Sequence, residues 1–232
     1  MSALALALGL WLAATPPAQG GEPGCAPPLD RRPAPPPVPP VRVTIPADAP
    51  GYGAALRPTP WGWIHRRRWC VWVEPPAGTG AALTRASQWH GAVDTALATW
   101  GQLLQLERVQ DPAAAQILVR RQRPPRRRDG QGGWRASHGR AEWQMDLVER
   151  GQGLSLETLI TVQVGADQRP AAMTATLLHE LGHAFGLWGH SPRSGDVMAA
   201  SPGPVPQVEL SQRDRATLQW LLDQPSAIAA PR

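Results

Sequence analysis

The stretch HELGHAFGLWGH, residues 179–190, holds three of the six histidines in the chain. His179 and His183 are four positions apart, so on a helix they lie on one face, one turn from each other, and both imidazoles can reach one metal ion. Glu180 is displaced by one position, which is too far round the helix for a third ligand. Its carboxylate can still hydrogen-bond a water at the metal. The stretch therefore predicts a metal-binding helix with a general base beside the metal.

Gly186 and His190 extend this pattern beyond the helix. Glycine tolerates positive φ, so the helix can end at Gly186 and the chain can reverse sharply. After the reversal, His190 can return to the metal as a third ligand. A structural zinc site would use four protein ligands, commonly cysteines, and neither cysteine is near in sequence. The pattern therefore favours an open, catalytic site with water as the fourth ligand.

The stretch resembles the extended zinc motif of the metzincins, HExxHxxGxxH, and is most similar to the matrixin (matrix-metalloprotease-like) branch. The matching residues are His179, Glu180, His183, Gly186 and His190. Downstream, Ser191 follows the third histidine, and Met198 stands eight residues after it, which is the spacing of the matrixin Met-turn.

One departure from the family pattern precedes the third histidine. Leu187-Trp188-Gly189 fills a gap that holds two residues in the motif. Glycine can absorb an inserted residue as a bulge or tight turn, which can require a positive φ at Gly189. The preserved spacing from His190 to Met198 places the insertion before His190. If His190 is not the third ligand, water or a carboxylate such as Asp196 completes the site.

The resemblance implies a fold and an activity. The expected fold is α+β, a metzincin-like zincin with a small twisted mixed sheet, a long packing helix, an active-site helix and a C-terminal helix. The expected activity is that of a zinc-dependent endopeptidase, with one catalytic zinc on His179, His183 and His190 and with Glu180 as the base. Met198 would form a hydrophobic floor under the metal. An edge strand within residues 134–146 would hold the substrate backbone in extended form.

Hydrophobic patterns predict the elements around the motif. Apolar residues, including Trp89 and Trp100, recur at spacings of three and four and predict a long helix over residues 84–107 with Thr84 as its cap. A helix is expected from about 171 to 185, and another after Ser211. Strands are expected at 68–74, at 115–120, within 135–148 and at 159–164. The order strand, helix, strands, helix, helix is that of an α+β domain.

The first 60 residues differ in composition from the rest. An apolar run over residues 3–14 is too short to span a bilayer and is followed by small residues, which predicts a signal peptide over 1–20 and a secreted or cell-envelope protein. Residues 16–60 hold 15 of the 27 prolines. This predicts a Pro-rich linker or short pro-segment over 21–60, outside the core. The catalytic domain would then cover 61–225, with a tail over 226–232.

The two cysteines, Cys25 and Cys70, leave three interpretations open. In an exported chain they could form one disulfide between the N-terminal segment and the domain. They could also be two unpaired thiols. The surroundings of Cys25 faintly resemble the cysteine-switch segment of matrix metalloprotease precursors, so its thiolate could instead cap the metal.

Two further segments are weaker candidates for ligand binding. Residues 129–133 resemble a glycine-rich ion-binding loop of matrixins, but a surface turn is preferred, since only His138 lies nearby for a second zinc. Calcium could bind such a loop, although nothing in the sequence supports it. The arginines within 120–128 form a basic run that could bind anionic polymers, but a solvated loop is preferred.

The expected partner is a protein or peptide substrate in extended conformation. Specific nucleic-acid binding is not expected, because the basic run lacks interleaved aromatic residues and a nucleic-acid-binding motif. No transmembrane segment is expected, and the chain is expected to be a monomer. Two other functions stay open: a zinc hydrolase of a non-protein amide, and a non-catalytic basic protein that binds anionic polymers.

Overall fold

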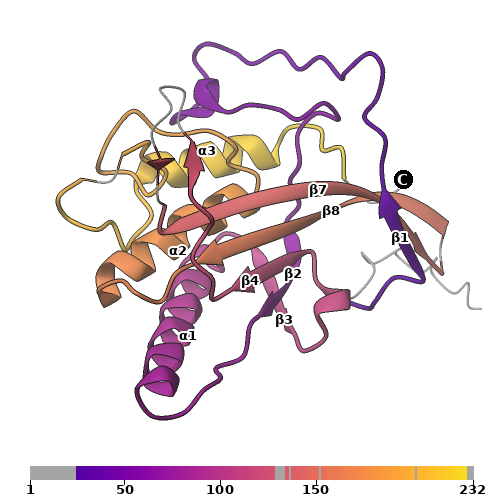
Figure 1. Ribbon diagram of the computed structural model, residues 1–232. Helices are drawn as coiled ribbons and strands as arrows, with labels where there is room; N and C mark the ends of the chain where they lie inside the picture. Colours follow the sequence, from indigo (N-terminus) through magenta and orange to yellow (C-terminus); the bar gives the residue numbers. More distant parts are fainter. Residues whose placement is uncertain (1–24, 129–133, 136, 152, 202, 229–232) are drawn as a thin grey trace, which may run out of the picture.

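The computed structural model describes residues 25–128, 134–135, 137–151, 153–201 and 203–228 (Figure 1). The predicted signal peptide, the glycine-rich loop and the end of the predicted tail lie outside the described residues. Within them, the chain forms an α+β domain with a mixed six-stranded sheet and three α-helices, as the sequence predicts.

The sheet has the order β1-β7-β8-β4-β2-β3. β1, β7 and β8 pair antiparallel, whereas β8, β4, β2 and β3 pair parallel. A separate two-stranded sheet joins β5 to β6. The strands are β1 (Asp30–Pro33), β2 (Arg68–Val73), β3 (Gln105–Val109), β4 (Ile117–Arg120), β5 (Arg127–Arg128), β6 (Trp134–Arg135), β7 (Gly139–Arg150) and β8 (Gly153–Val164).

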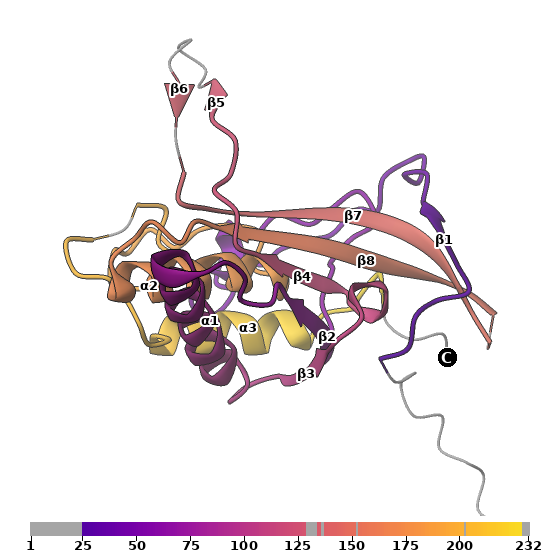
Figure 2. The ribbon, with the colours of Figure 1, turned by 60° about the horizontal axis from the view of Figure 1, so that its bottom comes forward.

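The three α-helices lie on the same side of the long strands β7 and β8 (Figure 2). The α-helices are α1 (Gly80–Trp100), α2 (Pro170–Ala184) and α3 (Gln212–Leu222). The domain also contains two short 3-10 helices, η1 (Gly53–Ala55) and η2 (Pro112–Ala114). α2 begins with a proline, whose fixed φ suits the first helical position. Ser211 caps α3 in a capping box with Asp214, so the predicted start of this helix is confirmed.

The predicted helix over 84–107 is partly wrong at both ends. α1 begins at Gly80, and Thr84 lies inside it, where its hydroxyl donates to the Gly80 carbonyl. Turns follow Trp100, and residues 105–109 then pair with β2 as strand β3. Apolar spacing continues through this strand, so periodicity alone did not separate the helix from the strand that follows it.

The predicted core stripe on α1 is confirmed. Trp89 and Trp100 are both fully buried. The indole N–H of Trp89 donates to the Val164 carbonyl on β8 at 3.0 Å, and that of Trp100 donates to the Leu178 carbonyl on α2 at 3.1 Å. The two rings therefore join α1 to the sheet and to the helix that carries the histidine motif.

The N-terminal segment, residues 25–60, is part of the folded domain, which contradicts the expectation of a linker outside the core. Residues 30–33 form β1 on the edge of β7, and Tyr52 and Leu56 are buried. Figure 1 shows the segment, in purple, running along one side of the domain between β1 and β2. Proline removes backbone donors within residues 35–40, but the residues on either side of that run still supply a strand and apolar side chains.

The first and the last described segments are both tied to the domain. Cys25 and Cys70 form a disulfide, so neither the unpaired thiols nor the metal-capping thiolate occurs. At the other end, the Ala227 N–H donates to the Trp63 carbonyl at 2.8 Å, and Ile228 is buried, so residues 226–228 are not a loose tail. None of the helices in the described part of the chain is both long and apolar enough to cross a membrane.

Candidate metal centre

Helix α2 and the turn that follows it bring three histidines together. The side-chain nitrogens of His179, His183 and His190 lie within 4.8 Å of one another, so the group could hold a metal ion. The ring of His190 is 5.3 Å from that of His179 and 5.0 Å from that of His183, measured between centroids. The structure therefore brings together the three histidines that the spacing predicts to converge. It offers no fourth His, Cys, Asp or Glu to this group among the residues that it describes.

Gly186 makes the reversal after α2 possible. Its φ is +109°, a conformation that residues with a side chain rarely adopt. A Cβ at this position would lie 2.5 Å from the Ile64 carbonyl oxygen, so a larger residue would also meet the backbone. The predicted role of this glycine is confirmed.

The two histidines on α2 are oriented by backbone carbonyls. Nδ1 of His179 bonds the Val197 carbonyl at 2.8 Å, and Nδ1 of His183 bonds the Leu187 carbonyl at 2.8 Å. In these bonds Nδ1 donates its hydrogen, which leaves Nε2 of each ring with a free lone pair. Burial lowers the pKa of both imidazoles, and for His183 burial together with the neighbouring His179 lowers the pKa to about 3. Both rings are therefore neutral at pH 7, as metal ligands must be.

The inserted residue Gly189 has a different role from the one expected. Its φ is not positive, so it is not a left-handed bulge. Instead, the N-terminal segment passes close to it. A Cβ on Gly189 would lie 2.9 Å from Leu56 Cα and closer still to the Ala55 carbonyl oxygen. The Arg57 N–H also donates to the Trp188 carbonyl at 2.7 Å. Glycine is needed here for close backbone packing.

The turn over residues 195–198 lies beneath the motif. Met198 is fully buried, and its sulfur is the nearest neighbour to the place where a Cβ on Gly182 would stand. This packing against α2, one residue from His183, agrees with the expected hydrophobic floor. The carboxylate of Asp196 is bonded by Ser191, Ser211 and Arg213, so it is engaged away from the three histidines.

Tyr52 takes part in holding this turn, and the sequence analysis missed it. Its hydroxyl donates to Asp214 at 2.8 Å, and the same carboxylate accepts the backbone N–H groups of Val197 at 3.0 Å and Met198 at 3.4 Å. Burial and the Asp214 charge raise the pKa of Tyr52, so its proton stays on the hydroxyl. Since Val197 in turn orients His179, the network reaches one of the three histidines. No local pattern marks Tyr52, although it is the only tyrosine in the chain.

Glu180 is buried next to the start of β7. The residue is 8% exposed, and burial raises its pKa to about 7, partly offset by the Ala141 backbone and by the charge of Arg140. A Cβ on Gly139 would lie 2.7 Å from Glu180 Cγ and 2.8 Å from its Oε1. The glycine therefore lets the strand approach the carboxylate, and the carboxylate can change protonation near neutral pH.

A cleft of about 1140 Å³ contains all four predicted site residues. The first part of β7 lines it, and so do residues 199–200 and 203–207. Residues 57–60 of the N-terminal segment also line the cleft. His138 lines it too, but it is not part of the three-histidine group. The site is therefore a groove that could accept an elongated ligand.

The basic run outside the cleft is partly neutralised within the domain. Arg121 lies 3.7 Å from Glu74, and Arg123 lies 2.7 Å from Asp167. Arg120 stacks over Trp72 at 5.5 Å. These contacts agree better with a structural or solvated loop than with a free anion-binding patch.

Comparison with known proteins does not assign the chain to a family. No family model matches it, and no curated protein is significantly similar to it.

Proposed function

We propose that the protein is a zinc-dependent endopeptidase of the metzincin type. The observation that carries the proposal is the combination found in the cleft. Three neutral imidazoles converge with no fourth protein ligand among the described residues, a buried carboxylate stands beside them, and an unpaired strand edge borders the groove. An open metal position next to a general base is the arrangement that metal-assisted hydrolysis needs.

The donor set fits zinc. Imidazole nitrogen is a common zinc ligand, and three protein ligands with one open position are typical of catalytic zinc sites. His179, His183 and His190 would hold the ion. When bound there, zinc would lower the pKa of a water molecule and polarise the carbonyl of the bond to be cleaved. The hydrogen bonds from Nδ1 to backbone carbonyls fix both rings on α2 for this role.

Glu180 would move the proton in this reaction. Its carboxylate would take a proton from the attacking water and pass it to the nitrogen of the departing amine. Glu180 is buried and lines the same cleft as the three histidines, which is where a base for that water would have to lie. The close packing of Gly139 against Glu180 keeps the carboxylate beside β7, where a substrate would lie.

The edge of β7 supports a peptide as the substrate. On the side facing the cleft, β1 pairs only with residues 146–149, so no described strand covers residues 139–144 there. An extended peptide could add to this edge through backbone hydrogen bonds. A hydrolase for a small non-protein amide would share the metal and the base but would not need this edge. The contacts of the basic run give the anionic-polymer alternative less support than the cleft gives a peptidase.

The disulfide supports the proposal of export. Structural disulfides form and persist in oxidising compartments such as the periplasm and the extracellular space. A secreted or cell-envelope location would provide these conditions.

The test is Glu180→Gln, with the exposed Glu209→Gln as a matched control. We expect about one zinc per chain in all three proteins, since the ligands are unchanged. Cleavage of unfolded casein should be abolished by a chelator, and Glu180→Gln should lower the rate by a factor of about 100 or more. A Glu180→Gln protein that cleaves casein at the parental rate would refute the role of this base. Zinc binding without any peptide cleavage by the parent would favour the non-protein amide.

A further inference from the structure

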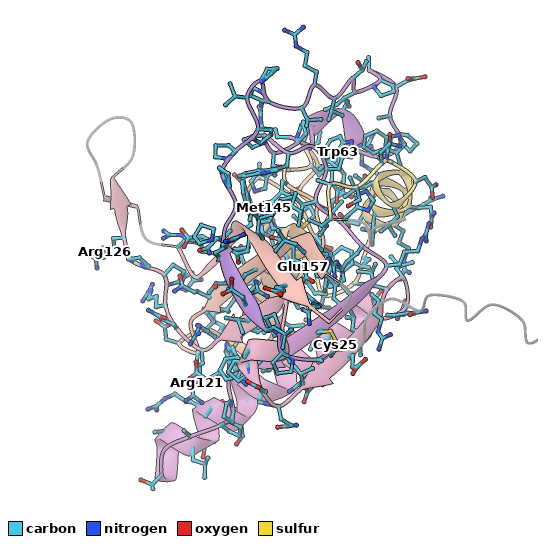
Figure 3. All side chains as sticks on the ribbon, turned by 90° about the vertical axis from the view of Figure 1, so that its right-hand side faces the viewer. Cys25, Trp63, Arg121, Arg126, Met145 and Glu157 are labelled. Atoms are coloured by element: carbon cyan, nitrogen blue, oxygen red, sulfur yellow. A yellow bond between two sulfur atoms is a disulfide. The ribbon has the colours of Figure 1, made fainter. Side chains whose placement is uncertain are left out.

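The N-terminal segment occupies part of the same strand edge that borders the cleft. β1 pairs antiparallel with β7 from Asp30 opposite Glu149 to Pro33 opposite Asp146. The last bond of this pairing runs from the Ala34 N–H to the Met145 carbonyl at 2.9 Å. Figure 3 views this end of the sheet, with Cys25 and Met145 labelled. The prolines that follow then leave the edge, and β7 continues toward the metal centre.

The same segment returns to form a wall at this end of the cleft. Pro58, Thr59 and Pro60 line the cleft, and the Pro60 carbonyl accepts the Val41 N–H at 2.8 Å. The ring of Trp61 packs edge-on against Trp143 of β7, with centroids 5.8 Å apart. The space beside Trp143 is therefore bounded by β1 along the strand and by residues 58–61 across it.

The register of β7 sets how much peptide fits between the wall and the base. Glu180 packs against the start of β7, where a Cβ on Gly139 would lie 2.8 Å from its Oε1, and Ala141 lines the same cleft, so the cleaved bond would lie near Ala141. Met145, already paired with Ala34, is four residues further along the strand. At about 3.3 Å per residue this is about 13 Å. About three residues of an extended peptide fit in that length before the chain would meet Ala34.

β1 also indicates the direction of a bound peptide. An antiparallel strand on this edge runs from Glu149 toward Gly139, as β1 does. A peptide that follows the same direction continues the line of β1, and its N-terminal end points at Ala34. The restricted end of the cleft is therefore the one that receives the residues before the cleaved bond.

The obstructing segment is firmly attached. Arg31 forms a 3.0 Å ion pair with Asp146, whose carboxylate is fully buried. Arg150 donates to the Ala26 carbonyl, and the disulfide joins Cys25 to β2. Displacing β1 would break these contacts together, so a substrate cannot simply replace it.

We propose that β1 and residues 58–61 close the cleft on the N-terminal side of the cleaved bond, so that the protein prefers bonds about three residues from the free N-terminus of its substrate. The inference rests on the proposed peptidase function. It adds that this chain selects substrates by the number of residues before the cleaved bond, because its own N-terminal segment blocks the space that further residues would occupy.

A peptide series tests the proposal. The peptides share the residues after the cleaved bond and carry from one to six residues before it. We expect kcat/KM to rise up to about three residues and to fall at least about tenfold between three and six. A rate that stays constant or rises beyond three residues overturns the inference. In that case chelator-sensitive cleavage that is lost in Glu180→Gln would leave the proposed function standing, whereas no cleavage of any peptide would reject both.

A variant of the segment tests which residue sets the limit. Ala34→Pro removes the N–H that bonds Met145 and frees one more position on β7. We expect the fall in kcat/KM between the three-residue and six-residue peptides to become several-fold smaller, with the rate for the three-residue peptide retained. Ala47→Pro is the matched control, because Ala47 is exposed in the same segment at a turn position that suits proline. An unchanged length dependence in a folded Ala34→Pro protein would contradict the role of β1.

Discussion

Gly189→Ala should weaken the metal centre by steric conflict with the N-terminal segment. The new Cβ would lie 2.9 Å from Leu56 Cα and closer still to the Ala55 carbonyl oxygen, and both are backbone atoms that cannot rotate away. The loop before His190 or residues 55–56 must therefore move. Because φ at Gly189 is not positive, backbone strain adds nothing to this effect.

The magnitude follows from overpacking. Forcing a methyl group into a well-packed site costs about 1–3 kcal/mol. A Gly→Ala change also lowers the conformational entropy of the unfolded chain, which raises the free energy of unfolding by about 0.4–1 kcal/mol and offsets part of this cost. We therefore expect a net loss of about 1–2 kcal/mol in the free energy of unfolding. A displaced His190 should also lower zinc affinity by about tenfold or more, as is typical of changes around metal ligands.

Gly195→Ala is the matched control for this substitution. Gly195 lies in the next loop, its φ is not positive, and a Cβ there would meet nothing within 4 Å. This variant should be as stable as the parent or slightly more stable. Urea unfolding of the metal-free proteins and zinc titration against a competing chelator give the two readouts. Equal stability and equal zinc affinity for Gly189→Ala and Gly195→Ala would refute the steric explanation.

Three further changes test the surroundings of the site. Tyr52→Phe leaves the buried Asp214 without one hydrogen-bond donor. The free energy of unfolding, measured in urea, should fall by about 1–3 kcal/mol, and zinc should bind more weakly. Parental values for both quantities would contradict the role of this network. Burial lowers the pKa of His65 from 6.5 to about 4 in the folded protein, so the unfolded chain binds a proton at His65 more tightly than the folded chain does. The free energy of unfolding should therefore fall by about 2 kcal/mol when the pH is lowered from 7.5 to 5. Metal-free His65→Gln should lack that part of the pH dependence, and an unchanged pH dependence would show that His65 does not titrate as described. Replacing Cys25 and Cys70 by serine removes a cross-link between residues 45 positions apart and should lower the free energy of unfolding by about 3–4 kcal/mol in thermal or urea unfolding. Parental stability would show that the cross-link does not restrict the denatured chain.

The sequence by itself determined the features that depend on local spacing. Histidines four residues apart on a helix must share a face, and a glycine that tolerates positive φ can end that helix, so the convergence of His179, His183 and His190 was predictable. The capping box at Ser211 depends on a residue three positions away and was equally visible. The buried stripe on α1 follows from the period of the helix.

Only the tertiary structure decided what the N-terminal segment does. The pairing of β1 with β7, the bond from Tyr52 to Asp214 and the close approach of Leu56 to Gly189 all join residues more than a hundred positions apart. Contacts between residues so far apart produce no periodic pattern in the sequence from which they could be predicted. A proline-rich composition predicts missing backbone donors, but it does not show whether the residues between the prolines find partners elsewhere in the chain. Those residues are buried against a strand and a helix that are distant in sequence, so the predicted linker forms a wall of the cleft. Burial of apolar side chains and pairing of a free strand edge stabilise this arrangement, and both depend on which distant segments the fold brings together.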